Sequence, residues 1–150
     1  MIEFINKNRD RKICIIVSGD TGFYSLLSFL RKSYSREELN VIPGISSYQY
    51  LFSHIGEVWQ DYKLLSVHGR EAEYVEIFSK ERGIVLLTDN INTPYVIAKN
   101  IYEAGYRDVE IVVGERLSYP DEKITFINIE DYEKLNREFF INLMIVRKKS

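Results

Sequence analysis

The pattern of hydrophobic positions changes its period near the start of the chain. Residues 13–17 form an unbroken apolar run, which is typical of a strand covered on both faces in a parallel sheet. The next apolar residues have the i, i+3, i+4, i+7 spacing of one helix face, at Phe23, Leu26, Leu27 and Leu30. The pattern therefore predicts a strand, a short loop and a helix in this stretch.

The same change of period recurs along the chain and predicts an α/β fold. Further strands are expected at residues 40–42, 62–67, 83–87, 109–113, 124–128 and 141–147, and helices around residues 48–55, 71–79 and 93–104. The last helix has Thr93 as its N-cap, Pro94 in its first position and Gly105 as its terminator. Residues 1–12 resemble the tail of a helix followed by a basic turn.

An aperiodic stretch at residues 56–61 indicates a connection between two α/β lobes. We expect residues 1–58 to form the remainder of an amino-terminal lobe and residues 59–150 to form a carboxyl-terminal lobe, with a cleft between them. Because the first lobe holds only two predicted strands, it is small for a sheet of its own. The first lobe is therefore expected to be incomplete.

Polar or glycine-bearing loops follow five of the predicted strands, at residues 18–20, 43–47, 68–70, 88–90 and 114–118. If the strands are mostly parallel within each lobe, these loops gather at the carboxyl edges and line the cleft. Gly19 and Gly22 would let a ligand approach the main chain closely. Each loop can equally be an ordinary turn and helix cap, so no single loop decides the function.

Composition narrows the classes of protein and partner. With 20 basic and 22 acidic residues the net charge is −2, which argues against nucleic acid and anionic membranes as partners. No apolar run approaches the roughly 18 residues of a membrane span, and no signal peptide is seen, so a cytoplasmic protein is expected. Cys14 is expected to be a small core residue. His54 and His68 lack partners at metal-ligand spacing, so no metal site is expected.

Five motifs in order are more specific than any one loop: VSGDTGFYSLL, VIPGISSYQYLF, WQDYKLLSVHGR, LLTDNINTP and VVGERLSYPDEKI. Together they resemble the tetrapyrrole (corrin/porphyrin) methylase family over residues 13–127. The blocks HGR and GERLS favour the branch that methylates carbon 5 of a cobalt-precorrin. Members of this family open with a strand and a glycine-rich loop that this sequence lacks, so we expect a truncated piece of such an enzyme.

The resemblance implies a set of ligand-binding residues. In this family S-adenosylmethionine binds in a folded conformation between the two lobes. The residues that would contact it are Ser18, Gly19, Asp20, Phe23, Ser46, Ser47, Leu87, Thr88 and Gly114. The carboxylates of a corrin substrate would pair with Arg70 and Arg116, because a guanidinium group can bind a carboxylate bidentately. The proton acceptor stays open among His68, Asp89 and Glu115.

The expected function is S-adenosylmethionine-dependent methylation of carbon 5 of a cobalt-precorrin in cobalamin biosynthesis, by a homodimer. Because part of the family's site is missing, the 150-residue chain is expected to bind S-adenosylhomocysteine weakly or not at all. Two alternatives stay open. One is a non-catalytic module that binds a nucleotide or another small molecule, and the other is a methylase for a different corrin or porphyrin carbon.

Overall fold

The computed structural model describes residues 1–67 and 73–149 of the chain. Two compact units make up the chain, Met1–Ser47 and Tyr48–Ser150. None of the described helices is long and apolar enough to cross a bilayer. The division into lobes at residues 58 and 59 stays a prediction.

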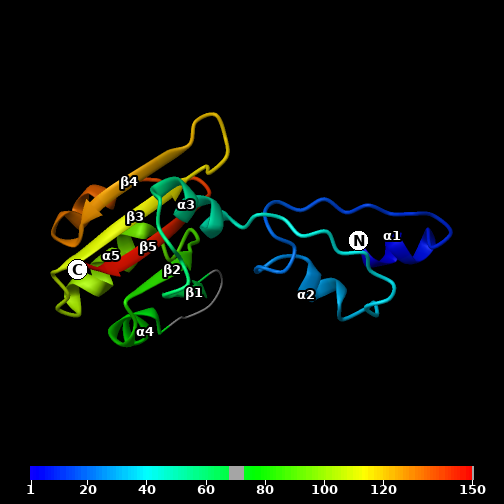
Figure 1. The fold of residues 1–150 in the computed structure, drawn as a ribbon, viewed down its shortest axis with the longest axis horizontal. Helices are drawn as coiled ribbons and strands as arrows, with labels where there is room; N and C mark the ends of the chain where they lie inside the picture. The colour runs from blue at the N-terminus through cyan, green and yellow to red at the C-terminus, as the bar shows by residue number, and fades with distance from the viewer. Residues whose placement is uncertain (68–72, 150) are drawn as a thin grey trace. The chain divides into compact units, whose positions relative to one another are not determined.

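The Tyr48–Ser150 unit is built on a five-stranded sheet of β1 (Tyr62–Ser66), β2 (Gly83–Leu87), β3 (Val109–Glu115), β4 (Lys123–Asn128) and β5 (Asn142–Lys148). The spatial order is β1-β2-β5-β3-β4, so the last strand of the chain lies in the middle of the sheet (Figure 1). All five strands lie where the sequence pattern predicts them, within two residues at each end. This sheet, with its helices, confirms the α/β class.

The sheet is mixed, which corrects the expectation of mostly parallel strands. β1 and β2 are parallel, whereas β5 is antiparallel to both β2 and β3, and β4 is antiparallel to β3. It follows that β1, β2 and β3 end at one edge of the sheet, and that β4 and β5 begin there. The carboxyl edge therefore carries the starts of two strands as well as the predicted loops at residues 88–90 and 114–118.

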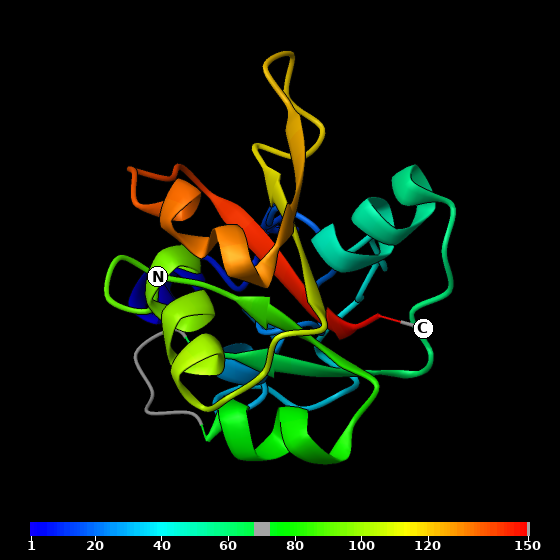
Figure 2. The same cartoon turned by 90° about the vertical axis from the view of Figure 1, so that its left-hand side faces the viewer.

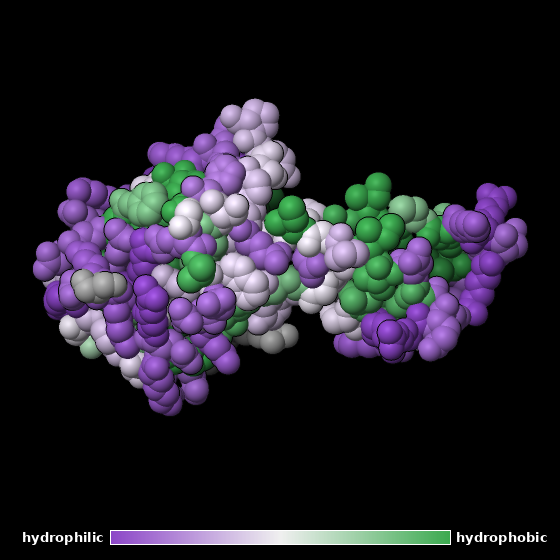
Figure 3. Space-filling model, viewed as in Figure 1, coloured by the Kyte–Doolittle hydropathy of each residue, from purple (hydrophilic) through white to green (hydrophobic). Residues whose placement is uncertain are grey.

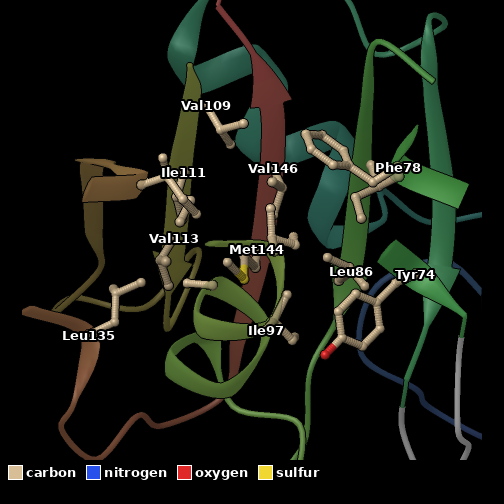
Figure 4. Close-up of a cluster of buried hydrophobic side chains, with 14 of the residues drawn as sticks. Tyr74, Phe78, Leu86, Ile97, Val109, Ile111, Val113, Leu135, Met144 and Val146 are labelled. Atoms are coloured by element: carbon tan, nitrogen blue, oxygen red, sulfur yellow. The ribbon is translucent and has the colours of Figure 1, made fainter. Parts of the chain in front are cut away.

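Helices cover both faces of the sheet. α4 (Tyr74–Lys80), α5 (Pro94–Glu103) and the 3₁₀ segment η1 (Ile129–Leu135) supply residues to the main core, with α5 and η1 over the same face in Figure 2. Alternate strand residues point into this core, as Figure 4 shows for Leu86, Ile111, Val113, Met144 and Val146. α3 (Ser47–Ile55) packs outside this core, where its Phe52 ring lies edge-to-face on Tyr62 of β1.

Local signals in α5 act as predicted. The Thr93 hydroxyl accepts a hydrogen bond from the Val96 N–H at 3.3 Å, and Pro94 occupies the first position, where a missing N–H costs nothing. Gly105 follows the helix with a φ of +95°, a left-handed conformation that favours glycine. This helix therefore begins and ends for the reasons that the sequence suggests.

The Met1–Ser47 unit differs most from the predictions. Its helices are α1 (Ile2–Lys7), which confirms the expected helix near the start, and the single turn α2 (Leu27–Leu30). The strands predicted at residues 13–17 and 40–42 do not form, and Ile16 is 91% exposed. Cys14 is exposed rather than part of a core.

The physical reason is the lack of strand partners among the described residues of this unit. A β-branched run becomes a buried strand only where neighbouring strands take up its hydrogen bonds, and no such pairing is formed within Met1–Ser47. Its apolar side chains consequently reach the surface, where Figure 3 shows them gathered. The helix predicted from residue 23 is shortened to its last turn.

Candidate functional site

Two of the predicted donor-binding loops contact each other within the Met1–Ser47 unit. The carboxylate of Asp20 accepts hydrogen bonds from the N–H of Gly22 at 2.8 Å and from the N–H of Gly44 at 3.4 Å. A Cβ atom added to Gly44 would lie 2.3 Å from the carbonyl oxygen of Gly19. Glycine at position 44 is therefore required for this close approach, and residues 18–22 and 43–46 form one cluster.

The other predicted residues of this unit lie on or beside that cluster. Gly19 has a φ of +71°, which favours glycine, while a Cβ there would make only ordinary contacts with residues 45 and 46. Ser18 is exposed, and Ser46 is buried. Ser47 is the first residue of α3, and the half-buried ring of Phe23 lies edge-to-face on Tyr24. Glycine is therefore favoured at position 19 by the left-handed backbone conformation, and not by a lack of space for a side chain.

In the Tyr48–Ser150 unit, the predicted residues meet at the carboxyl edge of the sheet. Leu87 of β2 and Gly114 of β3 both pair with the same residue of β5, Leu143. One step further along, the Thr88 hydroxyl donates to the side-chain oxygen of Asn142 at 2.6 Å. The register therefore places Leu87 and Gly114 in one row across the sheet, on either side of Leu143, with Thr88 one residue further along beside Asn142.

Gly114 also has a packing role. A Cβ at this position would lie 2.9 Å from the side chain of Leu117 and 3.1 Å from that of Leu51 in α3. The absent side chain thus leaves room for two leucines, one of them in the loop that follows β3. Glycine at position 114 thus has a packing role in addition to its predicted contact with the donor.

A hollow of about 1040 Å³ opens beside this row, and we call it the edge hollow. One side of it is formed by residues 87–91 with Thr93, and the other by residues 137–142. Three large apolar side chains on it are mostly exposed, namely Ile91, Phe140 and Ile141. A volume of this size suits a small-molecule ligand, because such sites commonly enclose about 300 to 1,000 Å³.

Residues 137–142 are the part of this site that the sequence did not indicate. They precede an antiparallel strand, whereas the sequence pattern pointed to loops that follow the ends of strands. A usable signal was present, because Phe139, Phe140 and Ile141 form an apolar run directly before a strand. Two of these three side chains stay exposed, which is a reason to suspect a binding surface.

The candidate proton acceptors at this edge are engaged in structural contacts. Asp89 accepts hydrogen bonds from the N–H groups of Ile91 and Asn92, at 2.8 and 2.6 Å, and so shapes its own turn. Glu115 is buried and bound bidentately by Arg137, whose pKa this hydrogen bonding raises. His68 lies outside the described residues, as does Arg70, so the structure gives no account of either.

Arg116, the other predicted substrate-binding residue, is held in a local ion pair. Its guanidinium lies 2.6 Å from the carboxylate of Asp121 and over the ring of Tyr119, and its backbone is left-handed with a φ of +47°. The hydrogen bond from Arg116 holds the pKa of Asp121 below its usual value. A substrate carboxylate would have to compete with Asp121 for this guanidinium.

No group of three or more metal-ligating side chains occurs among the residues that the structure describes.

A second hollow, of about 510 Å³, lies at the opposite edge of the sheet. Its Arg147 is paired with Glu57 and Glu110, and its Arg82 with Asp61. Burial would lower the pKa of Arg147, but the hydrogen bonds to Glu110, Tyr62 and Glu57 raise it overall. Its arginines thus have protein partners, so the edge hollow is the stronger candidate.

Comparison with known proteins gives one family and several relatives. The pattern of the Tetrapyrrole (Corrin/Porphyrin) Methylases matches residues 2–133. A cobalt-precorrin-7 C(5)-methyltransferase of Salmonella typhimurium is 28% identical over 146 residues, which cover 97% of this chain and 71% of that protein.

Two solved structures share the fold. The precorrin-6Y methylase of Archaeoglobus fulgidus has a TM-score of 0.71 at 19% identity, over 99% of this chain and 69% of its own. A uroporphyrin-III C-methyltransferase of Thermus thermophilus, complexed with S-adenosylhomocysteine, has a TM-score of 0.62 at 21% identity, over 86% and 62% of the two chains. Since the family match spans most of the sequence, the chain belongs to the tetrapyrrole (corrin/porphyrin) methylases, the family of S-adenosylmethionine-dependent C-methyltransferases that the five motifs predicted.

Proposed function

We propose that this protein transfers a methyl group from S-adenosylmethionine to carbon 5 of a cobalt-precorrin in cobalamin biosynthesis. The observation that carries the proposal is the likeness to a cobalt-precorrin-7 C(5)-methyltransferase over 97% of the chain. Membership of the methylase family supports the donor and the reaction class. The carbon that is methylated rests on the relative's name and on the HGR and GERLS blocks.

The residues fit a methyl donor on two grounds. The close packing of Gly44 on the backbone of Gly19 fixes the two loops against each other, and the exposed Ser18 lies beside this contact. At the sheet edge, Leu87 and Thr88 line a hollow with exposed apolar side chains, which suits a flat apolar ring. We therefore assign donor binding to Ser18, Gly19, Asp20, Phe23, Ser46, Ser47, Leu87, Thr88 and Gly114.

The chemistry asks for alignment more than for a reactive side chain. Bound S-adenosylmethionine supplies a methyl group on a sulfonium, whose thioether leaves with the bonding electron pair. Holding the reactants in line is worth about 7 to 11 kcal/mol in well-oriented cases. Arg116 binds a substrate carboxylate after exchange with Asp121. No residue is assigned as the proton acceptor.

The test is methyl transfer by the purified protein, with isotope-labelled S-adenosylmethionine and cobalt-precorrin-7 as the substrate probe. The expected product gains one labelled methyl group, located at carbon 5 by NMR. Label at a different ring carbon would overturn the assignment of carbon 5. Stoichiometric binding of S-adenosylhomocysteine without any methyl transfer would overturn the enzymatic proposal in favour of a binding module.

We propose a homodimer on the basis of the family resemblance, and a cytoplasmic location remains a prediction. Light scattering of the purified protein at several concentrations measures the mass of the assembly directly. A mass of twice 17.7 kDa is expected for the dimer. A mass of 17.7 kDa at all concentrations would refute it.

A further inference from the structure

Residues 137–142, which we call the wall segment, form one side of the edge hollow without belonging to a helix, and only Asn142 belongs to a strand. An irregular segment of this kind keeps one conformation only if its ends are held. In the chain it runs from just after η1 to the start of β5. What holds the wall segment therefore decides the shape of the hollow.

The carboxyl end of the wall segment is tied to both neighbouring strands. The carbonyl oxygen of Ile141 accepts a hydrogen bond from the N–H of Arg116 at 2.9 Å, directly after β3. The side-chain oxygen of Asn142 accepts from the Thr88 hydroxyl at the end of β2, and its amide donates to the carbonyl of Phe140 at 2.8 Å. These bonds position residues 140–142 against the sheet.

The amino end is held by a backbone hydrogen bond from the N–H of Arg137 to the carbonyl of Leu135 at 2.8 Å, by Phe139 packed against the main core, and by a buried ion pair. Glu115, the last residue of β3, is buried, and both of its oxygens accept hydrogen bonds from the Arg137 guanidinium at 2.9 and 2.5 Å. The same guanidinium donates to the carbonyl of Glu138 and lies 3.9 Å from the centre of the Phe139 ring. A bidentate pair of this kind fixes direction as well as distance.

Between these anchors, the side chains of Phe140 and Ile141 are 70% and 75% exposed and line the hollow. The Phe140 ring lies 5.8 Å from the Arg116 guanidinium, and because both side chains are so exposed, their placement depends largely on how the two ends of the wall segment are held. We infer that Glu115 and Arg137 are positioning residues, which hold Phe140 and Ile141 as an apolar wall for a flat ring of the bound ligand. This inference rests on the proposed function, and the ring is either the purine of the donor or the macrocycle of the substrate.

The test compares Arg137→Lys and Glu115→Gln with the wild-type protein. Arg147→Lys is the matched control, because it removes the forked contacts of Arg147 to Glu57 and Glu110 at the opposite edge. Lysine keeps the charge of arginine but cannot make the bidentate contact. Hydrogen exchange of residues 138–141 reports the order of the wall segment without any ligand.

We expect Arg137→Lys and Glu115→Gln each to speed that exchange, and Arg147→Lys to leave it unchanged. Disorder that the ligand must remove weakens binding, so KM should rise about tenfold with kcat within about twofold of wild type. A rise confined to S-adenosylmethionine identifies the purine, and a rise confined to the cobalt-precorrin identifies the macrocycle. The double variant should lose no more than either single variant, because the pair acts as a unit.

Unchanged exchange in Arg137→Lys would overturn the inference, as would an equal effect of Arg147→Lys. A fall in kcat with KM unchanged would also overturn it, since that result indicates a role in the reaction itself. If the wild-type protein transfers no methyl group, the proposed function fails on its own. The exchange experiment would then still decide whether the ion pair orders the wall segment.

Discussion

Replacing Gly44 by alanine tests whether the contact between the two glycine loops serves donor binding. The added Cβ would lie 2.3 Å from the carbonyl oxygen of Gly19 and 3.0 Å from its carbonyl carbon. Real Cβ contacts are essentially never shorter than 3.0 Å. The loops must therefore separate by at least 0.7 Å, which is the difference between this limit and the contact of 2.3 Å. The obstacle is backbone, which cannot rotate away as a side chain would.

Forcing a methyl group into a filled space costs about 1 to 3 kcal/mol. If the donor needs the loops in contact, this cost appears in binding as a loss of about 5- to 150-fold in affinity. The assay is calorimetric titration with S-adenosylhomocysteine, at protein concentrations high enough to measure the weak binding that is expected of this chain. A folded Gly44→Ala protein with wild-type affinity would refute the argument that this loop contact forms the donor site.

Gly22→Ala is the matched control for Gly44→Ala. A Cβ at Gly22 would meet only the side-chain oxygen of Asp20, at 3.3 Å. That atom lies at the end of a rotatable side chain, so a small adjustment suffices. We expect Gly22→Ala to change the affinity far less than Gly44→Ala, and circular dichroism should show both variants folded. Equal losses in the two variants would indicate that any added bulk near Asp20 is harmful.

Further predictions concern burial and charge. Ile97→Ala, in the core, should destabilise the protein by about 2 to 5 kcal/mol in urea unfolding, whereas the exposed Ile16→Ala should change stability by less than about 0.5 kcal/mol. Cys14 should react fully with a thiol reagent in the folded protein, because it is exposed. Asp121→Asn should free Arg116 and tighten binding of uroporphyrin, a polycarboxylate. Because the hydrogen bond from Arg116 lowers the pKa of Asp121, the pairing is fully present above the usual carboxyl pKa and is lost only as pH falls through the lowered value, so the gain in the variant should be measured at neutral pH, where the carboxylates of uroporphyrin are also charged.

The helices and strands of the Tyr48–Ser150 unit could be predicted because each strand that the sequence indicates has a neighbouring strand to pair with. Residues 83–87 are predicted to be a strand, and β2 does form there, between β1 and β5. Thr93, Pro94 and Gly105 delimit a helix by chemistry that acts within a few residues. Such signals need no knowledge of distant contacts, so helix and strand positions follow from them.

The same reasoning failed at residues 13–17 because an apolar run reports a tendency to be buried, not the presence of a partner. The described part of Met1–Ser47 supplies no strand to pair with it, and Ile16 and Cys14 stay exposed. The wall segment was missed for a related reason. Strand direction is a property of the whole sheet, so no local pattern indicated that β5 would begin at the carboxyl edge beside Thr88.

Gly114 shows why one substitution cannot assign a binding role, and it leads to a final prediction. A Cβ there would press on Leu117 at 2.9 Å, and Leu117 directly follows Arg116, the proposed partner of a substrate carboxylate. Gly114→Ala can therefore weaken donor binding through the strand, or substrate binding through the loop. Pairing it with Leu117→Ala separates the two, because the smaller side chain removes the contact at 2.9 Å and leaves only the contact with Leu51 at 3.1 Å, which lies outside this loop. If the double variant regains the wild-type KM for the cobalt-precorrin but not for S-adenosylmethionine, Gly114 contacts the donor. If it regains both, the glycine serves packing alone, and its assignment to the donor site is wrong.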